Sequence, residues 1–230
     1  MIYLTGDTHG NFYRILDFCE EMNTTKEDIM IILGDAGINY YLNKRDEHLK
    51  EFIDLMPTTL FCIHGNHEQR PYAIETYKES KWHGGTVYIE EAHPSIIFAK
   101  DGEVYDFNGK KAIVIGGAYS IDKFYRLMRG YAWFENEQPS EEIKKCVEEK
   151  LDEINWSVDY VFSHTVPIKY EPIEVFLPRI DQSKVDKSTE IWLGKLEEKL
   201  QYQKWYCGHY HTKKVVDRIQ LLFENYEMFD

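Results

Sequence analysis

The chain has 230 residues, of which 43% are hydrophobic and 29% are charged, a composition typical of soluble globular proteins. Its 27 lysines and arginines against 40 aspartates and glutamates give a formal net charge of −13, which disfavours a protein that binds nucleic acid through a basic surface. No apolar run is long enough to span a membrane and no signal peptide is visible at the N-terminus, so we expect no membrane association and a cytoplasmic location.

The first 80 residues alternate between strand and helix patterns. Residues 1–5, 29–33 and 58–63 are short apolar runs of the kind found in buried strands. Between them, residues 12–19 and 49–56 each place apolar side chains at helical spacing. Strands that alternate with helices over short connections predict βαβ units and a parallel sheet.

The middle of the chain contains two tight-turn signals. Asp101-Gly102 and Asn108-Gly109 supply the positive φ that hairpin turns require, and together they predict an antiparallel meander over about residues 95–116. A helix is expected over about residues 140–154, with Ser140 as its N-cap.

The last third returns to alternating elements. We expect a strand at 158–163, an irregular excursion at 168–186, a helix at 187–200, a strand at 204–207 and a hairpin over 215–225. The whole chain, residues 1–230, is therefore predicted to form one domain of the α/β class, a two-sheet mixed β-sandwich flanked by helices, with one parallel and one antiparallel half.

Polar residues follow the ends of five predicted strands, usually beside a glycine. In chain order they are Asp7, His9, Asp35, Asn66, His67, His164, His209 and His211. Parallel strands bring their carboxyl ends to one edge of a sheet, and open α/β sheets bind ligands at that edge. We therefore expect these side chains to converge.

Seven of these residues offer ligand atoms of the nitrogen and oxygen type: Asp7, His9, Asp35, Asn66, His164, His209 and His211. Such a set suits Mn, Fe, Zn, Ni or Co rather than Ca or Mg alone. Seven ligands are too many for one tetrahedral ion and suit two ions that share a carboxylate. Each short motif alone is commonly a turn or a helix cap, but their joint occurrence favours a metal centre. The four cysteines are scattered and are expected to be reduced thiols.

Five ordered motifs resemble those of the calcineurin-like metallophosphoesterases. The family pattern D-x-H, G-D-x-x-[DN], G-N-H-[DE], an isolated His and G-H-x-H is matched by GDTHG (6–10), GDAGI (34–38), GNHE (65–68), SH (163–164) and GHYH (208–211). The resemblance extends over almost the whole chain. It implies the four-layer αββα fold of that family and a binuclear metal-dependent phosphoric ester hydrolase.

The resemblance also implies a role for each matched residue. Asp7, His9 and His211 would hold one divalent ion, Asn66, His164 and His209 the other, and Asp35 would bridge them, whereas His67 would face the substrate. Mn is the expected metal, with Fe, Zn, Ni or Co as alternatives. A hydroxide between the ions would attack phosphorus in a phosphate mono- or diester, and His67 would protonate the leaving oxygen or stabilise the charged transition state.

The second motif departs from the protein-phosphatase branch, which reads G-D-x-x-D-R-G. Ile38, Asn39 and Tyr40 stand where that branch has the Asp that orients the catalytic histidine and the Arg that grips phosphate. Membership of that branch is therefore disfavoured. Asn39, one position late, is a candidate to orient His67.

Other residues are candidates for the lost phosphate contact. Arg70, Arg126 and Arg129 could supply the missing positive charge, and Tyr119 and Asp122 are candidate pocket residues. The expected substrate is a phosphorylated small molecule, a nucleotide or a phosphoprotein. Two alternatives remain at this point: a nuclease, which the acidic charge disfavours, and a non-catalytic metal-binding scaffold for protein interactions on the same fold.

Overall fold

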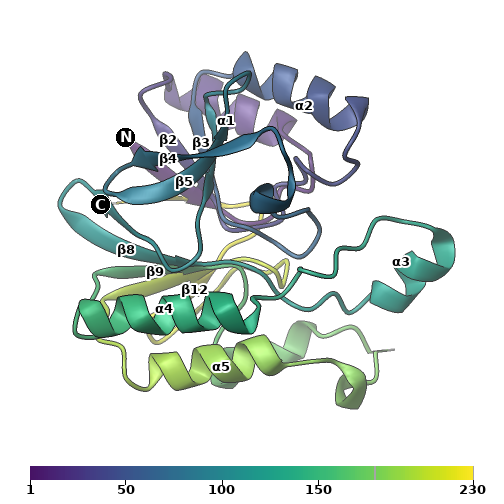
Figure 1. The fold of residues 1–230 in the computed structure, drawn as a ribbon, viewed down its shortest axis with the longest axis vertical. Helices are drawn as coiled ribbons and strands as arrows, with labels where there is room; N and C mark the ends of the chain where they lie inside the picture. Colours follow the sequence, from purple (N-terminus) through teal and green to yellow (C-terminus); the bar gives the residue numbers. More distant parts are fainter. Residues whose placement is uncertain (179, 230) are drawn as a thin grey trace.

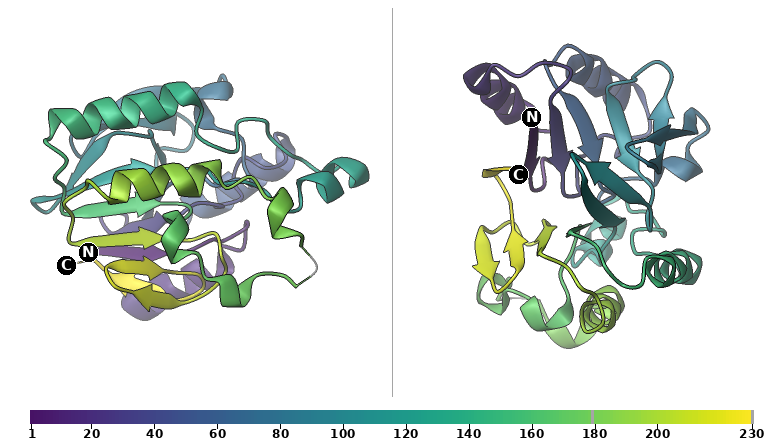
Figure 2. Two further views of the ribbon diagram at one scale, coloured as in Figure 1. Left: turned by 90° about the horizontal axis from the view of Figure 1, so that it is seen from below. Right: turned by 90° about the vertical axis from the view of Figure 1, so that its left-hand side faces the viewer.

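The computed structural model describes residues 1–178 and 180–229, which form two mixed sheets packed between two helical layers (Figures 1 and 2). The helices α1 and α2 cover the outer face of the first sheet, and α4 and α5 cover the outer face of the second (Figure 1). The predicted sandwich of two sheets flanked by helices is confirmed. None of the helices described is both long enough and apolar enough to cross a membrane.

The first sheet has the strand order β13-β1-β2-β3-β6-β5-β4, and the second has the order β11-β12-β10-β9-β8-β7. The strands of the first sheet are β1 (Ile2–Thr5), β2 (Ile29–Ile32), β3 (Thr59–Cys62), β4 (Tyr77–Trp82), β5 (Gly85–Glu90), β6 (Ile96–Ala99) and β13 (Tyr226–Met228). Those of the second are β7 (Val104–Phe107), β8 (Lys110–Ile115), β9 (Tyr160–Ser163), β10 (Lys204–Cys207), β11 (Lys214–Val216) and β12 (Ile219–Leu221). The helices are α1 (Tyr13–Met22), α2 (Lys44–Asp54), α3 (Lys123–Arg129), α4 (Glu141–Glu153) and α5 (Ser188–Glu197).

Both sheets have parallel centres and antiparallel edges. In the first sheet β1, β2, β3 and β6 run parallel, as the alternating pattern predicts for the first three of them. In the second sheet β8, β9, β10 and β12 also run parallel, and only β7 and β11 pair antiparallel at its edges. The prediction of an antiparallel half is therefore wrong, because helices and loops return the chain to the same end of both sheets.

The predicted meander over residues 95–116 is only half present. The Asn108-Gly109 turn joins β7 and β8 as an antiparallel hairpin. At Asp101-Gly102, however, the chain leaves the first sheet and enters the second, so β6 pairs with β3 and β5 and not with β7. A turn signal fixes the local change of direction, but it does not decide whether the two flanking strands pair.

Three apolar clusters separate the four layers. The central cluster fills the space between the sheets and includes Phe61, Phe107 and Phe162. A second lies between the first sheet and α1 and α2 and includes Ile15. A third lies between the second sheet and α4 and α5 and includes Leu151. Strands that are buried on both faces explain why the sequence shows continuous apolar runs and little alternation.

Several local predictions are confirmed. Ser140 caps α4 by accepting a hydrogen bond from the backbone N–H of Ile143. Residues 168–186 contain only short 3-10 turns, at Ile168–Tyr170, Ile173–Val175 and Gln182–Lys184, among the residues described there. The tail forms the β11–β12 hairpin, and all four cysteines are free thiols. The β4–β5 hairpin, the short helix α3 and the strand β13 were not predicted.

Candidate metal centre

The predicted polar residues converge at one edge of the sandwich. The loops after β1, β2 and β3 of the first sheet carry Asp7, His9, Asp35, Asn66 and His67, and the loops after β9 and β10 of the second carry His164, His209 and His211. The structure contains three overlapping groups of potential metal ligands, and within each group the ligand atoms lie within 4.8 Å of one another. The groups are Asp7, His9 and His211; His9, Asp35 and His67; and Asp7, Asp35 and His164. The site is thus assembled from both sheets at their shared carboxyl-end edge.

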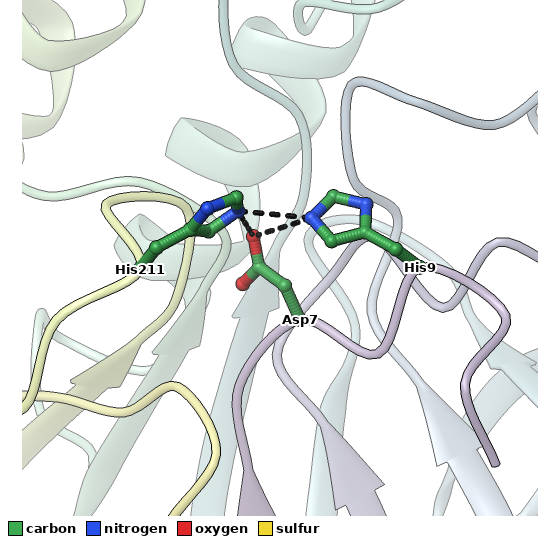
Figure 3. A group of neighbouring side chains, drawn as sticks. All are labelled: Asp7, His9 and His211. Atoms are coloured by element: carbon green, nitrogen blue, oxygen red, sulfur yellow. Dashed lines mark hydrogen bonds and ion pairs between the residues drawn. The ribbon is translucent and has the colours of Figure 1, made fainter. Parts of the chain in front are cut away.

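Asp7 lies among imidazoles (Figure 3). Its Oδ2 is 3.2 Å from Nε2 of His211 and 3.8 Å from Nε2 of His9, while its Oδ1 accepts a 2.8 Å hydrogen bond from the backbone N–H of His209. Oδ2 is buried and accepts no well-aligned hydrogen bond. Burial acts to raise the pKa of Asp7, but His211 and the other nearby histidines outweigh it and hold the pKa below its ordinary value.

Asp35 is the second buried carboxylate. Its Oδ1 accepts a 2.8 Å hydrogen bond from the backbone N–H of His67 and lies 3.7 Å from Nε2 of His164, and its Oδ2 lies 3.9 Å from Nδ1 of His9. Burial, together with the negative charge of Asp7, raises the pKa of Asp35 well above its ordinary value. Two buried carboxylates that repel each other in this way would be stabilised by a nearby cation.

The hydrogen bonds of His164 show that the site suits a metal. Its Nδ1–H donates to the carbonyl oxygen of Leu33 at 2.8 Å, so a neutral ring has no proton on Nε2. That Nε2 faces Oδ1 of Asn66 at 2.8 Å, and likewise Nε2 of His9 faces Nε2 of His211 at 2.9 Å. Two acceptor atoms that face each other, as Nε2 of His164 and Oδ1 of Asn66 do, are expected where both bind one ion, and a backbone carbonyl that fixes the ring tautomer is a common support for ligating histidines. The residues present therefore fit a metal centre.

His209 and Asn66 are the two remaining candidate ligands. The rings of His209 and His164 meet edge to face with their centroids 4.9 Å apart. Burial and the proximity of His164 lower the pKa of His209 to about 3, so its ring is neutral and able to bind a cation. The amide nitrogen of Asn66 donates to Oγ of Ser120 at 2.9 Å, which turns the amide oxygen toward His164.

Glycines next to the polar residues make room for them. A Cβ on Gly34 would overlap the ring of His164, and a Cβ on Gly65 would overlap the carboxylate and backbone of Asp35. These glycines are needed because neighbouring strand-end loops approach closely at this edge. Beside them the backbone itself is strained: Asp35, His9, His209 and His211 all have φ between 47° and 67°. Backbone strain of this kind concentrates at functional sites.

His67 lies between Arg126 and Asp35: its Nε2 is 3.9 Å from Oδ2 of Asp35. A guanidinium nitrogen of Arg126, which belongs to α3, lies against Nδ1 of the His67 ring. The same guanidinium is held by Asp122, whose Oδ2 accepts from Nε at 2.8 Å, and by the carbonyl oxygen of Ala132 at 3.1 Å. Burial and the charge of Arg126 lower the pKa of His67 to about 2, so the imidazole is neutral.

The side chains of two predicted substrate contacts, Asn39 and Arg70, are buried and bonded to other residues. The amide of Asn39 is buried and bonds to the hydroxyl of Tyr77 at 3.1 Å, so it does not orient His67. Arg70 is also buried, in an ion pair with Asp101, and its Nε donates to the carbonyl oxygen of Asn136 at 2.7 Å. Arg70 therefore ties loops together and is not free to bind a substrate.

Two cavities meet at His67. One, of about 480 Å³, is lined by His9, His67, Arg126, Arg45 and Tyr40, among others. The other, of about 430 Å³, is lined by ligand candidates including Asp35 and Asn66, and by the predicted pocket residues Tyr119 and Asp122. Arg126 and Tyr119 thus lie where a substrate could reach them, whereas Arg129 packs over the ring of Tyr125.

Several residues that hold the loops of the site in place were not predicted from the sequence. Glu68 accepts hydrogen bonds of 3.0 Å from the backbone N–H groups of Gly37 and Gly65 and so joins the second and third loops. Arg14 donates to the carbonyl oxygen of Asp7 at 3.1 Å. The position of Glu68 within GNHE offered a signal, whereas Arg14 and Ser120 lie outside every motif.

Comparison with known proteins is consistent with this geometry. A family model described as calcineurin-like phosphoesterase matches residues 1–221. Among solved structures, phosphopantetheinyl hydrolase (PptH) from Mycobacterium tuberculosis superposes with a TM-score of 0.52 at 13% identity, over 96% of this chain and 87% of its own. Another crystal structure gives a TM-score of 0.51 at 14% identity, over 96% of this chain and 88% of its own. No curated protein gives a significant match.

Proposed function

Since this chain belongs to the calcineurin-like phosphoesterase family, we propose that it hydrolyses phosphate mono- or diesters at a centre of two divalent metal ions, with Mn as the expected metal. The observation that carries this proposal is the pair of buried carboxylates, Asp7 and Asp35, surrounded by imidazoles whose ring nitrogens face inward. Buried charge of this density without an ion would cost several kcal/mol.

The proposed ligand sets follow the two sides of the cluster. Asp7, His9 and His211 would hold one ion, Asn66, His164 and His209 would hold the other, and Asp35 would lie between them. Asp35 would be the shared carboxylate; its proximity to His9 of the first set and to His164 of the second supports this role. When bound, the two ions would neutralise the charge of the phosphoryl oxygens and lower the pKa of water at the site.

His67 would serve the leaving group. Arginine is a hydrogen-bond donor only, and its guanidinium lies nearer Nδ1 than Nε2 of His67, which assigns Nδ1 as the acceptor and places the proton of the neutral ring on Nε2. Nε2–H would then donate a hydrogen bond to the leaving oxygen and stabilise the charge that develops there. In the hydrolysis a bond forms from the oxygen of water to phosphorus, the bond from phosphorus to the leaving oxygen breaks, and the proton that the water loses goes to the leaving oxygen.

Arg126 would also help to bind the substrate. Its charge lies at the cavity that also contains Arg45, so it can attract the negatively charged end of a substrate although the chain carries a net charge of −13. This chain lacks the Arg with which the protein-phosphatase branch binds phosphate. Arg126, on the helix α3, would supply a positive charge in its place.

The test is an assay of the Mn²⁺-loaded protein with an aryl phosphate monoester and the matching diester. We expect turnover of at least one ester in the wild type and none in Asp35→Asn, with the metal content of both proteins measured in parallel. The ratio of the two rates assigns the subclass. Equal turnover in wild type and Asp35→Asn would contradict the proposal, because the activity would then come from elsewhere.

A further inference from the structure

One wall of the 430 Å³ cavity is apolar. Besides the ligand candidates, the cavity is lined by Val175, Phe176, Leu177, Ile180 and Val185, all from the excursion between β9 and α5, and by Ile121 on the opposite side. The volume lies in the range of pockets that enclose small organic ligands. An apolar wall that begins at the metal cluster would touch the part of a substrate that is joined to the phosphoryl group.

The acidic groups in this wall already have partners. Besides the ligand candidate Asp35, Glu171 pairs with Lys187 at 2.7 Å, Glu190 accepts from Oγ1 of Thr165 at 2.7 Å, and Asp186 accepts from the backbone N–H of Ser188 at 2.9 Å. Asp122 binds Arg126 through Oδ2, whereas its Oδ1 has no hydrogen-bond partner among the described residues. The described residues that line this cavity include no lysine or arginine. The lining therefore offers no cationic side chain to a polyphosphate or to an acidic peptide, and apolar surface makes up most of the wall, with Tyr119 and Gln182 as polar neighbours.

Part of the apolar wall stays exposed to water. The exposed fractions are 39% for Ile121, 40% for Val175 and 57% for Leu177. Apolar side chains gathered around a concave site are a feature of binding surfaces, because covering them removes apolar area from water.

The two cavities differ in character and share His67. The first contains Arg126 and Arg45, and the second contains the apolar wall. His67, which we propose as the donor to the leaving oxygen, lines both. A substrate whose phosphoryl group lay at the ligand candidates would have its scissile bond beside His67, with Arg126 near the charged end and the apolar alcohol along the wall of the second cavity.

We infer that the substrate is a phosphate ester of an apolar alcohol, and that the alkyl or aryl group of this alcohol occupies the cavity between the 168–186 excursion and Ile121. The inference rests on the proposed hydrolytic function of the same site. The products would be the apolar alcohol and the corresponding phosphate.

The test uses ethyl, butyl and hexyl phosphate as substrates and the matching alkylphosphonates, whose P–C bond is not hydrolysed, as ligands in calorimetry. In the wild type kcat/KM and the association constant should rise with chain length, by up to about fourfold for each methylene that is buried. Leu177→Asp should remove most of that rise. Ile173→Asp is the matched control, since Ile173 is exposed in the same excursion but does not line the cavity, and it should keep the wild-type dependence on length.

The outcomes separate the two proposals. Equal rates and equal affinities for all three lengths in the wild type would overturn the inference while leaving the hydrolase intact. No turnover of the alkyl phosphates or of the aryl monoester and diester, with phosphonate affinity still rising with length, would contradict the hydrolase but retain the apolar pocket. An equal loss of length dependence in Leu177→Asp and Ile173→Asp would also overturn the inference, because the wall would then not be the surface that binds the chain.

Discussion

The guanidinium of Arg126 lies against Nδ1 of His67, although 59 residues separate them in the chain. In the protein-phosphatase branch an Asp of the second motif orients this histidine; that Asp is missing from this sequence, and the structure places a guanidinium against Nδ1 instead. A carboxylate would accept a proton from Nδ1, whereas a guanidinium donates to it, so the two partners favour opposite tautomers of a neutral ring.

Arg126→Gln should therefore reduce activity through His67 as well as through substrate binding. We expect kcat to fall by about 10- to 100-fold, or about 1.4 to 2.7 kcal/mol of transition-state stabilisation, and KM to rise. Steady-state kinetics on the better of the two aryl esters measures both. Arg129→Gln, on the same helix but packed over Tyr125, is the control and should leave both constants unchanged; equal losses in the two variants would mean that α3 acts only as a structural unit.

His67→Ala should slow turnover without emptying the site. The loss of a hydrogen-bond donor to the transition state typically costs about 10²- to 10³-fold, and the seven proposed ligands remain in this variant. The decisive measurement is metal content by elemental analysis beside kcat. His67 also lies close enough to His9 and Asp35 to share an ion with them, so a variant that loses one ion per chain would show that His67 is a ligand.

Gly65→Ala should disrupt the site from the backbone. The added Cβ would overlap the carboxylate and backbone of Asp35, which must then move away from its neighbours. We expect reduced metal content and a lower Tm. Gly84→Ala is the comparison, because its Cβ would meet nothing within 4 Å and only the strain of its positive φ would apply, which costs about 1 kcal/mol. Wild-type metal content in Gly65→Ala would show that the loop can shift without loss of the site.

Glu190 predicts a specific dependence of stability on pH. Burial raises its pKa to about 7, above the roughly 4.3 expected in the unfolded chain. Between these values the folded state holds a proton that the unfolded state releases, so this residue makes stability fall as pH rises through that window. Glu190→Gln does not titrate, and we expect it to match the wild type near pH 4.5 and to exceed its unfolding free energy at pH 8 by on the order of 3 kcal/mol.

Chemical denaturation of both proteins at the two pH values checks this prediction. The quantity of interest is the difference between variant and wild type, because titration of all other groups largely cancels in it. Glu149→Gln, on the exposed face of α4, should show no such pH-dependent difference. A Glu190→Gln variant that is less stable than the wild type at pH 8 would contradict the prediction.

The sequence predicted what depends on local pattern. Continuous apolar runs identified the buried strands, and glycine beside Asp, Asn or His marked the strand ends that meet at the site. The predictions failed where the structure depends on residues that are far apart in the sequence. The Asp101-Gly102 turn looks the same whether the next strand pairs with the last or crosses to another sheet. Asn39 and Arg70 were assigned to the pocket by position alone, but Tyr77 and Asp101 hold their side chains elsewhere.

The contribution of each sheet to the metal centre has a consequence for biosynthesis. Asp7 and His211 are 204 residues apart (211 − 7), and at about 5 to 20 residues per second a ribosome makes them roughly 10 to 40 s apart. For most of that interval the emerging chain presents Asp7, His9, Asp35 and Asn66 without all three histidines of the second sheet. The full set of proposed ligands exists only after the second sheet has been made and has docked, so the folded protein, and not the growing chain, would select the ions that we propose.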